Sequence, residues 1–243
     1  MIWGWVKLHL FHDDPDDPLF GWSAWHAYTN GTRMSDGPAP DGETWFITSL
    51  FGAAARWGDG ARQSIRHRWS HDLTRSCHAG TGKVGFNYTE TANIILCAVS
   101  NKPGEQGMFT RAPHSIVRFD PGTPFTDPSY FLPAFYTIWA NKTSCTPERW
   151  NEAARSTREV LHASVNPKTG LAPHSCEYSG AALPCHGDHS CQFEDDAWRV
   201  ARNWAMDYHW HAADERQIEM SNALHRFFGT RVAFILVSSL AVK

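Results

Sequence analysis

The stretch TPERWNEAARSTREVLHASVNP, residues 146–167, has the clearest helix boundaries in the chain. Thr146 is expected to cap this helix, and Pro147 to occupy its first position, where a missing N–H costs nothing. Asn166 precedes Pro167 and is therefore disfavoured in a helix, so we expect the helix to end before it. Between these limits, helical spacing predicts a buried stripe of Trp150, Ala153, Ala154, Thr157, Val160 and Leu161.

Further helices are expected on both sides of this one. Apolar side chains recur at helical spacing in residues 2–11, 41–57, 87–99, 130–140, 195–208 and 215–228. With Asp41 as its cap, the second of these is predicted to bury Phe46, Leu50, Ala54 and Trp57. With Asp195 or Asp196 as its cap, the fifth is predicted to carry Trp198, Ala201, Trp204, Ala205 and Tyr208. Only residues 115–119 resemble a strand, so the pattern predicts an all-α fold built from helix pairs.

Composition limits the partners that this chain can have. A formal net charge of −3 and the lack of a basic run argue against nucleic acid and against an anionic membrane surface. The apolar run at residues 232–242 is too short to span a bilayer. Twelve Trp residues are more than usual, and aromatic rings stack on the apolar faces of sugars. The composition therefore favours a carbohydrate partner.

Cysteines and glycosylation sequons favour a secreted protein. The chain has six Cys, and N-x-[S/T] sequons begin at Asn30, Asn87 and Asn141. The first 17 residues, however, lack the basic and apolar regions of a signal peptide. We therefore expect an extracellular protein whose chain, as given, carries no signal peptide.

Acidic residues stand at the starts of two predicted helices. In SDGPAPDGETWF, residues 35–46, they are Asp41 and Glu43; in DAWR, residues 196–199, Asp196 lies one turn before Arg199. Each carboxylate alone is best explained as a helix cap, and Arg199 as an ion-pair partner that holds Asp196 in place. Two such helix starts beside Trp favour a second interpretation, the paired carboxylates of glycoside hydrolysis.

Six stretches occur together in an order that is specific to one family: PAPDGETWF, ARWGDG, DPSYFLPAFY, KTGLAP, HGD and DAWRVARNWAMDY. Through them the chain resembles glycoside hydrolase family 8, and within it the reducing-end xylose-releasing exo-oligoxylanases. The resemblance implies an incomplete (α/α)6 barrel of helical hairpins, of the six-hairpin glycosidase type, over residues 1–230, followed by an atypical apolar tail at 231–243. It further implies inverting hydrolysis of β-1,4-linked oligosaccharides, with xylo-oligosaccharides favoured, and no metal or cofactor.

The resemblance also implies roles for individual residues. Asp196 matches the general base that activates the attacking water, and Arg199 matches the Arg that accompanies it. Asp41 matches a carboxylate that grips the sugar at the cleavage subsite, and Glu43 follows it in the same motif as a further substrate-side residue. On this basis Asp41 and Asp196 are expected to face one cleft.

Two aromatic residues, Trp25 and Tyr130, resemble side chains that line the cleft of the family. Stacking on a sugar requires an open ring face. We therefore expect both rings to be partly exposed.

One catalytic residue of the family has no match in the chain. The family's general acid is a Glu in a Glu-Gly motif, and none of the ten Glu residues here is followed by Gly. Asp195 stands where many relatives carry Tyr. Glu43 is the one Glu inside a motif, but the helix dipole is expected to keep it ionised, the wrong state for an acid. The sequence is therefore expected to be a fragment with little activity alone.

Two alternatives stay open from the sequence. One is a non-catalytic carbohydrate-binding remnant, which would keep Asp41 and the aromatic residues and bind sugar without cleaving it. The other is a metal site, with His174 and Cys176 nearby, in a loop that holds Cys185, His186, His189 and Cys191. The spacing of these four residues fits no common zinc motif, so a disulfide-braced loop is the better interpretation of the same residues.

Overall fold

The computed structural model describes residues 2–60, 87–102, 107–110, 115–120, 122–184 and 191–240, with the backbone alone at 2–3 and 231–240. Within these ranges the regular elements are helices, and β-structure is limited to isolated bridges. The prediction of an all-α fold is therefore confirmed. The strand expected at residues 115–119 is wrong, because Val117 forms only an isolated bridge.

The chain divides into two compact units. Unit 1 comprises Met1–Phe109, Asp120–Gly122 and Ile138–Trp150, and unit 2 comprises Thr110–Phe119, Thr123–Thr137 and Asn151–Lys243. Helices α4 (Pro133–Lys142) and α5 (Pro147–Ser164) each contribute residues to both units. That residues 1–230 form one partial barrel domain stays a prediction.

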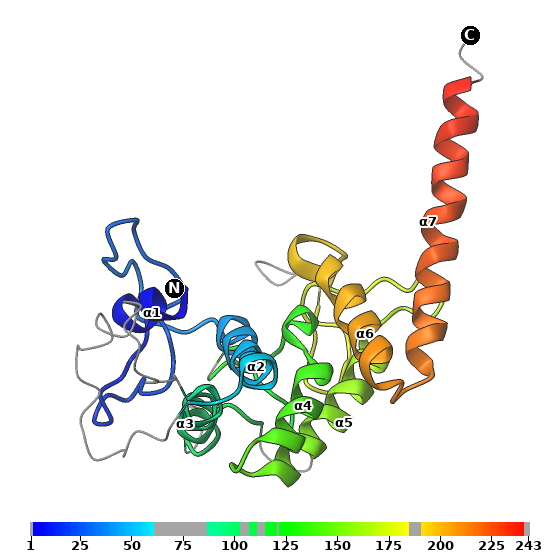
Figure 1. Cartoon of the computed structure of the whole chain (residues 1–243). Helices are drawn as coiled ribbons and strands as arrows, with labels where there is room; N and C mark the ends of the chain where they lie inside the picture. Colours follow the sequence, from blue (N-terminus) through cyan, green and yellow to red (C-terminus); the bar gives the residue numbers. More distant parts are fainter. Residues whose placement is uncertain are drawn as a thin grey trace. The chain divides into compact units, whose positions relative to one another are not determined.

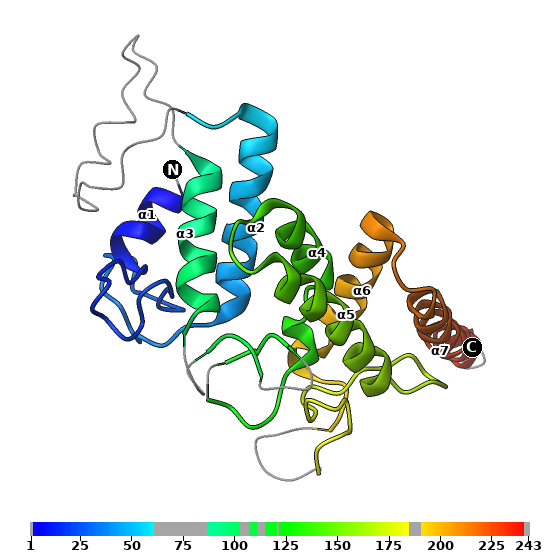
Figure 2. The same ribbon diagram turned by 90° about the horizontal axis from the view of Figure 1, so that it is seen from below.

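Helices α2 (Pro40–Trp57) and α3 (Tyr88–Ser100) lie side by side in unit 1, which also holds α1 (Ile2–His9) (Figure 1; Figure 2). The core here includes Ile47, Leu50, Phe51, Ala92, Ile95, Leu96 and Val99. The predicted stripe of α2 is wrong except for Leu50, since Phe46 and Ala54 are half-buried and Trp57 is exposed. The buried face of α2 begins at Glu43 and Thr44, two polar residues that an apolar pattern leaves out.

The end of α3 is joined to the turn between α4 and α5. Cys97 forms a disulfide with Cys145. Beside it, the Asn93 side-chain oxygen accepts hydrogen bonds from the Thr143 hydroxyl at 2.7 Å and from the Ser144 N–H at 2.9 Å. A covalent link and two hydrogen bonds therefore fix this turn on α3.

The starts of α3 and α5 are capped differently. The Asn87 side chain accepts a hydrogen bond from the Glu90 N–H at 2.9 Å, which caps α3. Pro147 begins α5 as predicted, but the Thr146 hydroxyl is buried without a hydrogen-bond partner in the described part of the chain. Thr146 has φ +47°, and a backbone in this region is not the extended one of a capping residue.

Unit 2 is built on most of α5, with α6 (Trp198–His211), α7 (Arg216–Leu240) and the short 3₁₀ turns η3 (Pro128–Tyr130) and η4 (Asp195–Ala197). The stripe predicted for α5 is confirmed, because all six of its residues are buried. The core of the unit comprises Ile116, Phe131, Val160, Leu161, Val165, Ala172, Cys176, Val200, Trp204 and Met220. α7 continues well beyond the predicted end at residue 228. None of the described helices is long and apolar enough to cross a membrane.

α6 carries the five residues predicted for it, and of these Trp204 is buried. The buried residues are Val200, Asn203, Trp204 and Asp207, whereas Trp198 is 57% exposed. Asp207 is buried because its charge is matched: Arg158 of α5 donates to both carboxylate oxygens at 2.7 Å, and Gln217 of α7 donates at 2.7 Å. Paired polar side chains therefore form part of the buried face of α6.

Candidate active site

Asp196 and Arg199 lie together on unit 2, where η4 passes into α6. The Arg199 Nη2 donates to Asp196 Oδ2 at 2.8 Å and to Ser129 Oγ at 3.0 Å. The Asp196 side chain is 48% exposed, and that of Arg199 only 17%. The predicted ion pair is thus confirmed: a largely buried guanidinium holds a carboxylate that is open to solvent.

Neither Asp195 nor Asp196 caps α6, contrary to the prediction. The residue before η4, Glu194, makes no side-chain cap bond, and α6 itself follows Ala197 without one. Asp195 has φ +43°, in the left-handed region that Asp tolerates better than most residues. The carboxylate of Asp196 therefore binds Arg199 in place of helix N–H groups.

Tyr130 borders the same ion pair. The guanidinium carbon of Arg199 lies 5.1 Å from the centroid of the Tyr130 ring. Phe119 meets that ring edge-on at 5.4 Å, and Phe125 lies 5.5 Å from Phe119. The Tyr130 ring is half-buried. Asp196, Arg199 and Tyr130, three residues that the resemblance selected, thus come together in one unit.

Two buried side chains beside this cluster were not predicted. Asp127 Oδ1 accepts the Ser129 N–H at 2.7 Å, and Asn203 Nδ2 donates to the Ser129 carbonyl at 2.7 Å. Burial raises the pKa of Asp127, although the Ser129 hydrogen bonds and the charges of His174 and Arg199 oppose this shift. An Asp directly before Pro is a sequence signal for a cap and could have revealed Asp127. Together these bonds fix Ser129, which in turn accepts from Arg199.

Asp41 belongs to unit 1, in the first turn of α2. The residue that precedes the helix is Ala39, and Pro40 takes the first helical position, so the prediction that Asp41 caps the helix is wrong. Its half-buried side chain lies one position further in, where negative charge still suits the helix dipole. That Asp41 and Asp196 face one cleft stays a prediction.

Trp25 also belongs to unit 1, and its ring is 59% exposed. Its backbone N–H donates to the Gly37 carbonyl at 3.1 Å, and its ring lies 3.6 Å from that of His26, centroid to centroid. The exposure predicted for Trp25 is confirmed, and the open surface is what stacking on a sugar requires.

Glu43 is placed differently from the expectation. It is 3% exposed, and its Oε1 accepts the Ser23 N–H at 2.5 Å. Burial raises its pKa to about 8, against the opposing effect of the hydrogen bonds at Glu43 and Ser23. The expectation of an ionised Glu43 is therefore wrong, because desolvation outweighs the dipole. The group is protonated at neutral pH, but it has no face open to a sugar.

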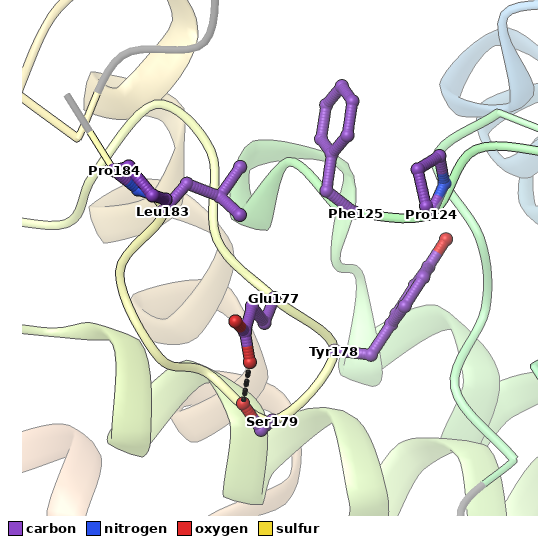
Figure 3. Close-up of a pocket in the computed structure, with 7 residues that line it drawn as sticks. All are labelled: Pro124, Phe125, Glu177, Tyr178, Ser179, Leu183 and Pro184. Carbon is purple, nitrogen blue, oxygen red and sulfur yellow. Dashed lines mark hydrogen bonds between the residues drawn. The ribbon is translucent and has the colours of Figure 1, made fainter. Parts of the chain in front are cut away.

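A hollow of about 630 Å³ lies on unit 2 (Figure 3). Its lining consists of Pro124, Phe125, Glu177, Tyr178, Ser179, Leu183 and Pro184. The Ser179 hydroxyl donates to the Glu177 carboxylate at 3.1 Å, and the Tyr178 hydroxyl donates to the Thr123 carbonyl at 3.2 Å. Apolar walls with a carboxylate and a hydroxyl suit a small polar ligand.

The loop proposed as a metal site lies mostly outside the described residues. This holds for Cys185, His186 and His189, and for the HGD motif. Cys191 is disulfide-bonded and so offers no thiolate to a metal. Cys176 is buried, which raises the pKa of its thiol to about 12. In the part of the chain that the structure describes, no group of three or more His, Cys, Asp or Glu side chains could hold a metal ion.

Comparisons with known proteins identify the family of the chain. Residues 76–236 match the model of the glycosyl hydrolases family 8. The chain is 34% identical over 232 residues to the reducing-end xylose-releasing exo-oligoxylanase Rex8A of Paenibacillus barcinonensis, covering 93% of this chain and 54% of that protein. It is 33% identical over 235 residues to the reducing end xylose-releasing exo-oligoxylanase of Halalkalibacterium halodurans, covering 95% and 54%. The solved structure of P. barcinonensis Rex8A complexed with xylose matches with a TM-score of 0.77 and 33% identity, over 93% of this chain and 55% of that one.

The chain belongs to glycosyl hydrolases family 8, as its motifs predicted. Its helices match part of the (α/α)6 fold of that family. The chain spans about half the length of the relatives that it matches.

Proposed function

We propose that this protein is an inverting glycoside hydrolase of β-1,4-linked xylo-oligosaccharides, with Asp196 as its general base. The observation that carries the proposal is the half-exposed Asp196 carboxylate, bound on one oxygen by Arg199, whose guanidinium lies over the Tyr130 ring. An exposed carboxylate beside an aromatic face is what a sugar-cleaving site needs on the side of the attacking water.

The arrangement gives each oxygen of Asp196 a separate task. Arg199 binds Oδ2, which leaves Oδ1 to accept a proton from water. As the proton moves to Asp196, the water oxygen bonds to the anomeric carbon on the face opposite the leaving group. The glycosidic bond breaks, and its oxygen takes a proton from a general acid. Attack from the opposite face converts a β-linkage into an α-configured product.

The general acid is not assigned to a residue of this chain. Glu43 has the protonation state that an acid needs, because its pKa is about 8. At 3% exposure, however, it does not reach a glycosidic oxygen. The proposal therefore assigns the general base on unit 2, and it names Asp41 and Trp25 of unit 1 as further sugar-binding residues.

The substrate class is supported by the names of the relatives. Two of them are reducing-end xylose-releasing exo-oligoxylanases, and a Rex8A structure holds xylose. An exposed Trp25 and the negative net charge suit a neutral sugar. We therefore infer xylo-oligosaccharides as ligands of this chain.

We also infer that the protein is secreted. The disulfide between Cys97 and Cys145 supports this, since such bonds persist in oxidising compartments. The sequon residues Asn30 and Asn141 are exposed, as glycosylation sites must be. Quantification of the protein in culture medium and in washed cells tests the inference.

The reaction is tested by incubating the chain with xylotriose and following the products by NMR. We expect slow turnover whose first product has the α-configuration. Asp196→Asn should lower the rate by about 10²–10⁴-fold, because it removes the general base, while xylotriose binding measured by calorimetry is retained. Asp195→Asn is the matched control, as it removes the neighbouring charge and leaves the pair with Arg199.

Three results would contradict the proposal. A β-configured first product would exclude inversion, and equal turnover by wild type and Asp196→Asn would exclude this base. Binding of xylotriose with no hydrolysis at all, even at high enzyme concentration, would show that the protein binds carbohydrate without cleaving it.

A further inference from the structure

Glu43 connects the loop that carries Trp25 with the helix that carries Asp41. The loop folds back on itself through the isolated bridge between Phe11 and Ser23. The Ser23 N–H of this loop donates a hydrogen bond to Oε1 of Glu43, in the first turn of α2. One residue separates Ser23 from Trp25, and one separates Glu43 from Asp41. One buried hydrogen bond thus joins the segments of two proposed sugar-binding residues within unit 1.

The buried end of Glu43 is a neutral acid at neutral pH. Since Oε1 accepts from Ser23, the proton resides on Oε2, which is buried and has no hydrogen-bond partner among the residues described. Ionisation would strengthen the bond to Ser23, but it would also place an uncompensated charge in a site that is 3% exposed. The raised pKa of Glu43 shows that the second effect is the larger. Ionisation of Glu43 therefore favours a state in which the loop that carries Ser23 and Trp25 has moved away from α2 and water reaches the Glu43 carboxylate.

We propose that Glu43 is a positioning residue, which as a neutral acid holds the Ser23–Trp25 segment against the first turn of α2. It thereby sets the place of the exposed Trp25 ring for a sugar gripped by Asp41. The second part rests on the proposed function, whereas the first concerns the protein alone.

Other titratable groups surround this contact and must be separated from Glu43. Asp41 lies on the same turn of α2 and raises the pKa of Glu43 by its negative charge. On the loop, His12 is hydrogen-bonded to Asp17 at 2.9 Å, and the His26 ring lies beside that of Trp25, tilted by 36°. A variant at His26 is therefore needed beside the variant at Glu43.

The test uses the whole chain labelled with 5-fluorotryptophan, with the Trp25 resonance assigned through Trp25→Phe. In wild type we expect this resonance to shift between pH 6.5 and 9.5 with a midpoint near 8, the pKa of Glu43. In Glu43→Gln, a neutral side chain of the same shape, it should keep its low-pH position throughout. In His26→Gln the Trp25 resonance should shift with the same midpoint as in wild type. In Glu90→Gln, a variant in the first turn of α3, the resonance should shift as in wild type.

Xylotriose affinity provides the second readout. Only about a tenth of Glu43 stays neutral at pH 9, so wild type should bind about tenfold more weakly there than at pH 7, while Glu43→Gln binds equally at both. A Trp25 resonance that titrates alike in Glu43→Gln, or that does not move in wild type, would overturn the positioning role. If the resonance behaves as expected but xylotriose binds at no pH, the positioning role is supported and the proposed function fails.

Discussion

Burial, more than position on a helix, decides the state of the acidic side chains of this protein. Glu43 lies in the first turn of α2, where the helix dipole favours a negative charge, yet burial raises its pKa to about 8. Glu159 is the opposite case: its side chain is 62% exposed, and its hydrogen bond with Arg216 lowers its pKa. One residue type therefore serves as a neutral acid at one site and as an anion at another.

The state of Glu43 predicts how stability changes with pH. Its folded pKa lies above the ordinary value, so its contribution to stability is fully present below about pH 4.5 and is lost as pH rises toward 8. Glu43→Gln cannot ionise and escapes this loss. We expect the free energy of unfolding of the variant, relative to wild type, to rise by on the order of 4 kcal/mol between pH 4.5 and 8. Urea unfolding across this range measures the difference.

Glu159→Gln is the control for this experiment. Because the pKa of Glu159 is lowered, its contribution is present above its ordinary pKa and is lost only in more acidic solution. Between pH 4.5 and 8 the free energy of unfolding of the variant should therefore change with pH in the same way as that of wild type. If the free energy of unfolding of Glu43→Gln also changed with pH as that of wild type does, Glu43 would be ionised in the folded protein.

At the scale of the helices, the sequence predicts the buried faces that are apolar. It misses the buried faces that contain paired polar side chains. All six residues of the α5 stripe are buried as predicted, because that face is apolar or small throughout. On α6 the buried face includes Asn203 and Asp207, whose partners come from elements distant in the sequence. No local pattern reveals that Arg158, 49 residues earlier, will pair with Asp207.

The same distinction applies to the candidate site. The pair of Asp196 and Arg199 was predictable, because a spacing of three residues places side chains on one helical face. The contact of Arg199 with Ser129 spans 70 residues and was not. The protonated state of Glu43 was also missed, since it depends on burial against Ser23, which no helix rule contains.

The buried ion pair between α5 and α6 gives a prediction at this scale. Arg158→Met leaves the Asp207 carboxylate buried without its cation, so we expect a loss of about 3–5 kcal/mol in the free energy of unfolding. Arg155→Met, an exposed Arg on the same helix, should change it by less than about 0.5 kcal/mol. Adding Asp207→Leu to Arg158→Met should recover part of the loss. Equal effects of the two Arg variants would contradict the account.

The disulfide between Cys97 and Cys145 gives a second prediction. It closes a loop across 48 positions, so removing it should cost about 2–4 kcal/mol of unfolding free energy. Cys145→Ala alone and the double variant with Cys97→Ala should lose the same amount, as both break one bond. Thermal unfolding measures the loss, and a melting temperature unchanged in the double variant would show that the bond does not form.

At the scale of the whole molecule, the order of the motifs carried more information than any one of them. PAPDGETWF and DAWR belong to different units, and each alone fits an ordinary helix start. Together with four further stretches they predicted the family that the comparisons confirmed. The division into two units was not predicted, because it depends on packing between segments far apart in the sequence.

The central proposal is that Asp196 and Arg199 form the catalytic side of a sugar site. Its most direct test is a crystal structure of the Asp196→Asn variant with xylotriose bound. We predict one xylose unit in contact with the side chain at position 196, and Arg199 still bonded to Ser129. Xylotriose bound away from position 196 would contradict the proposal.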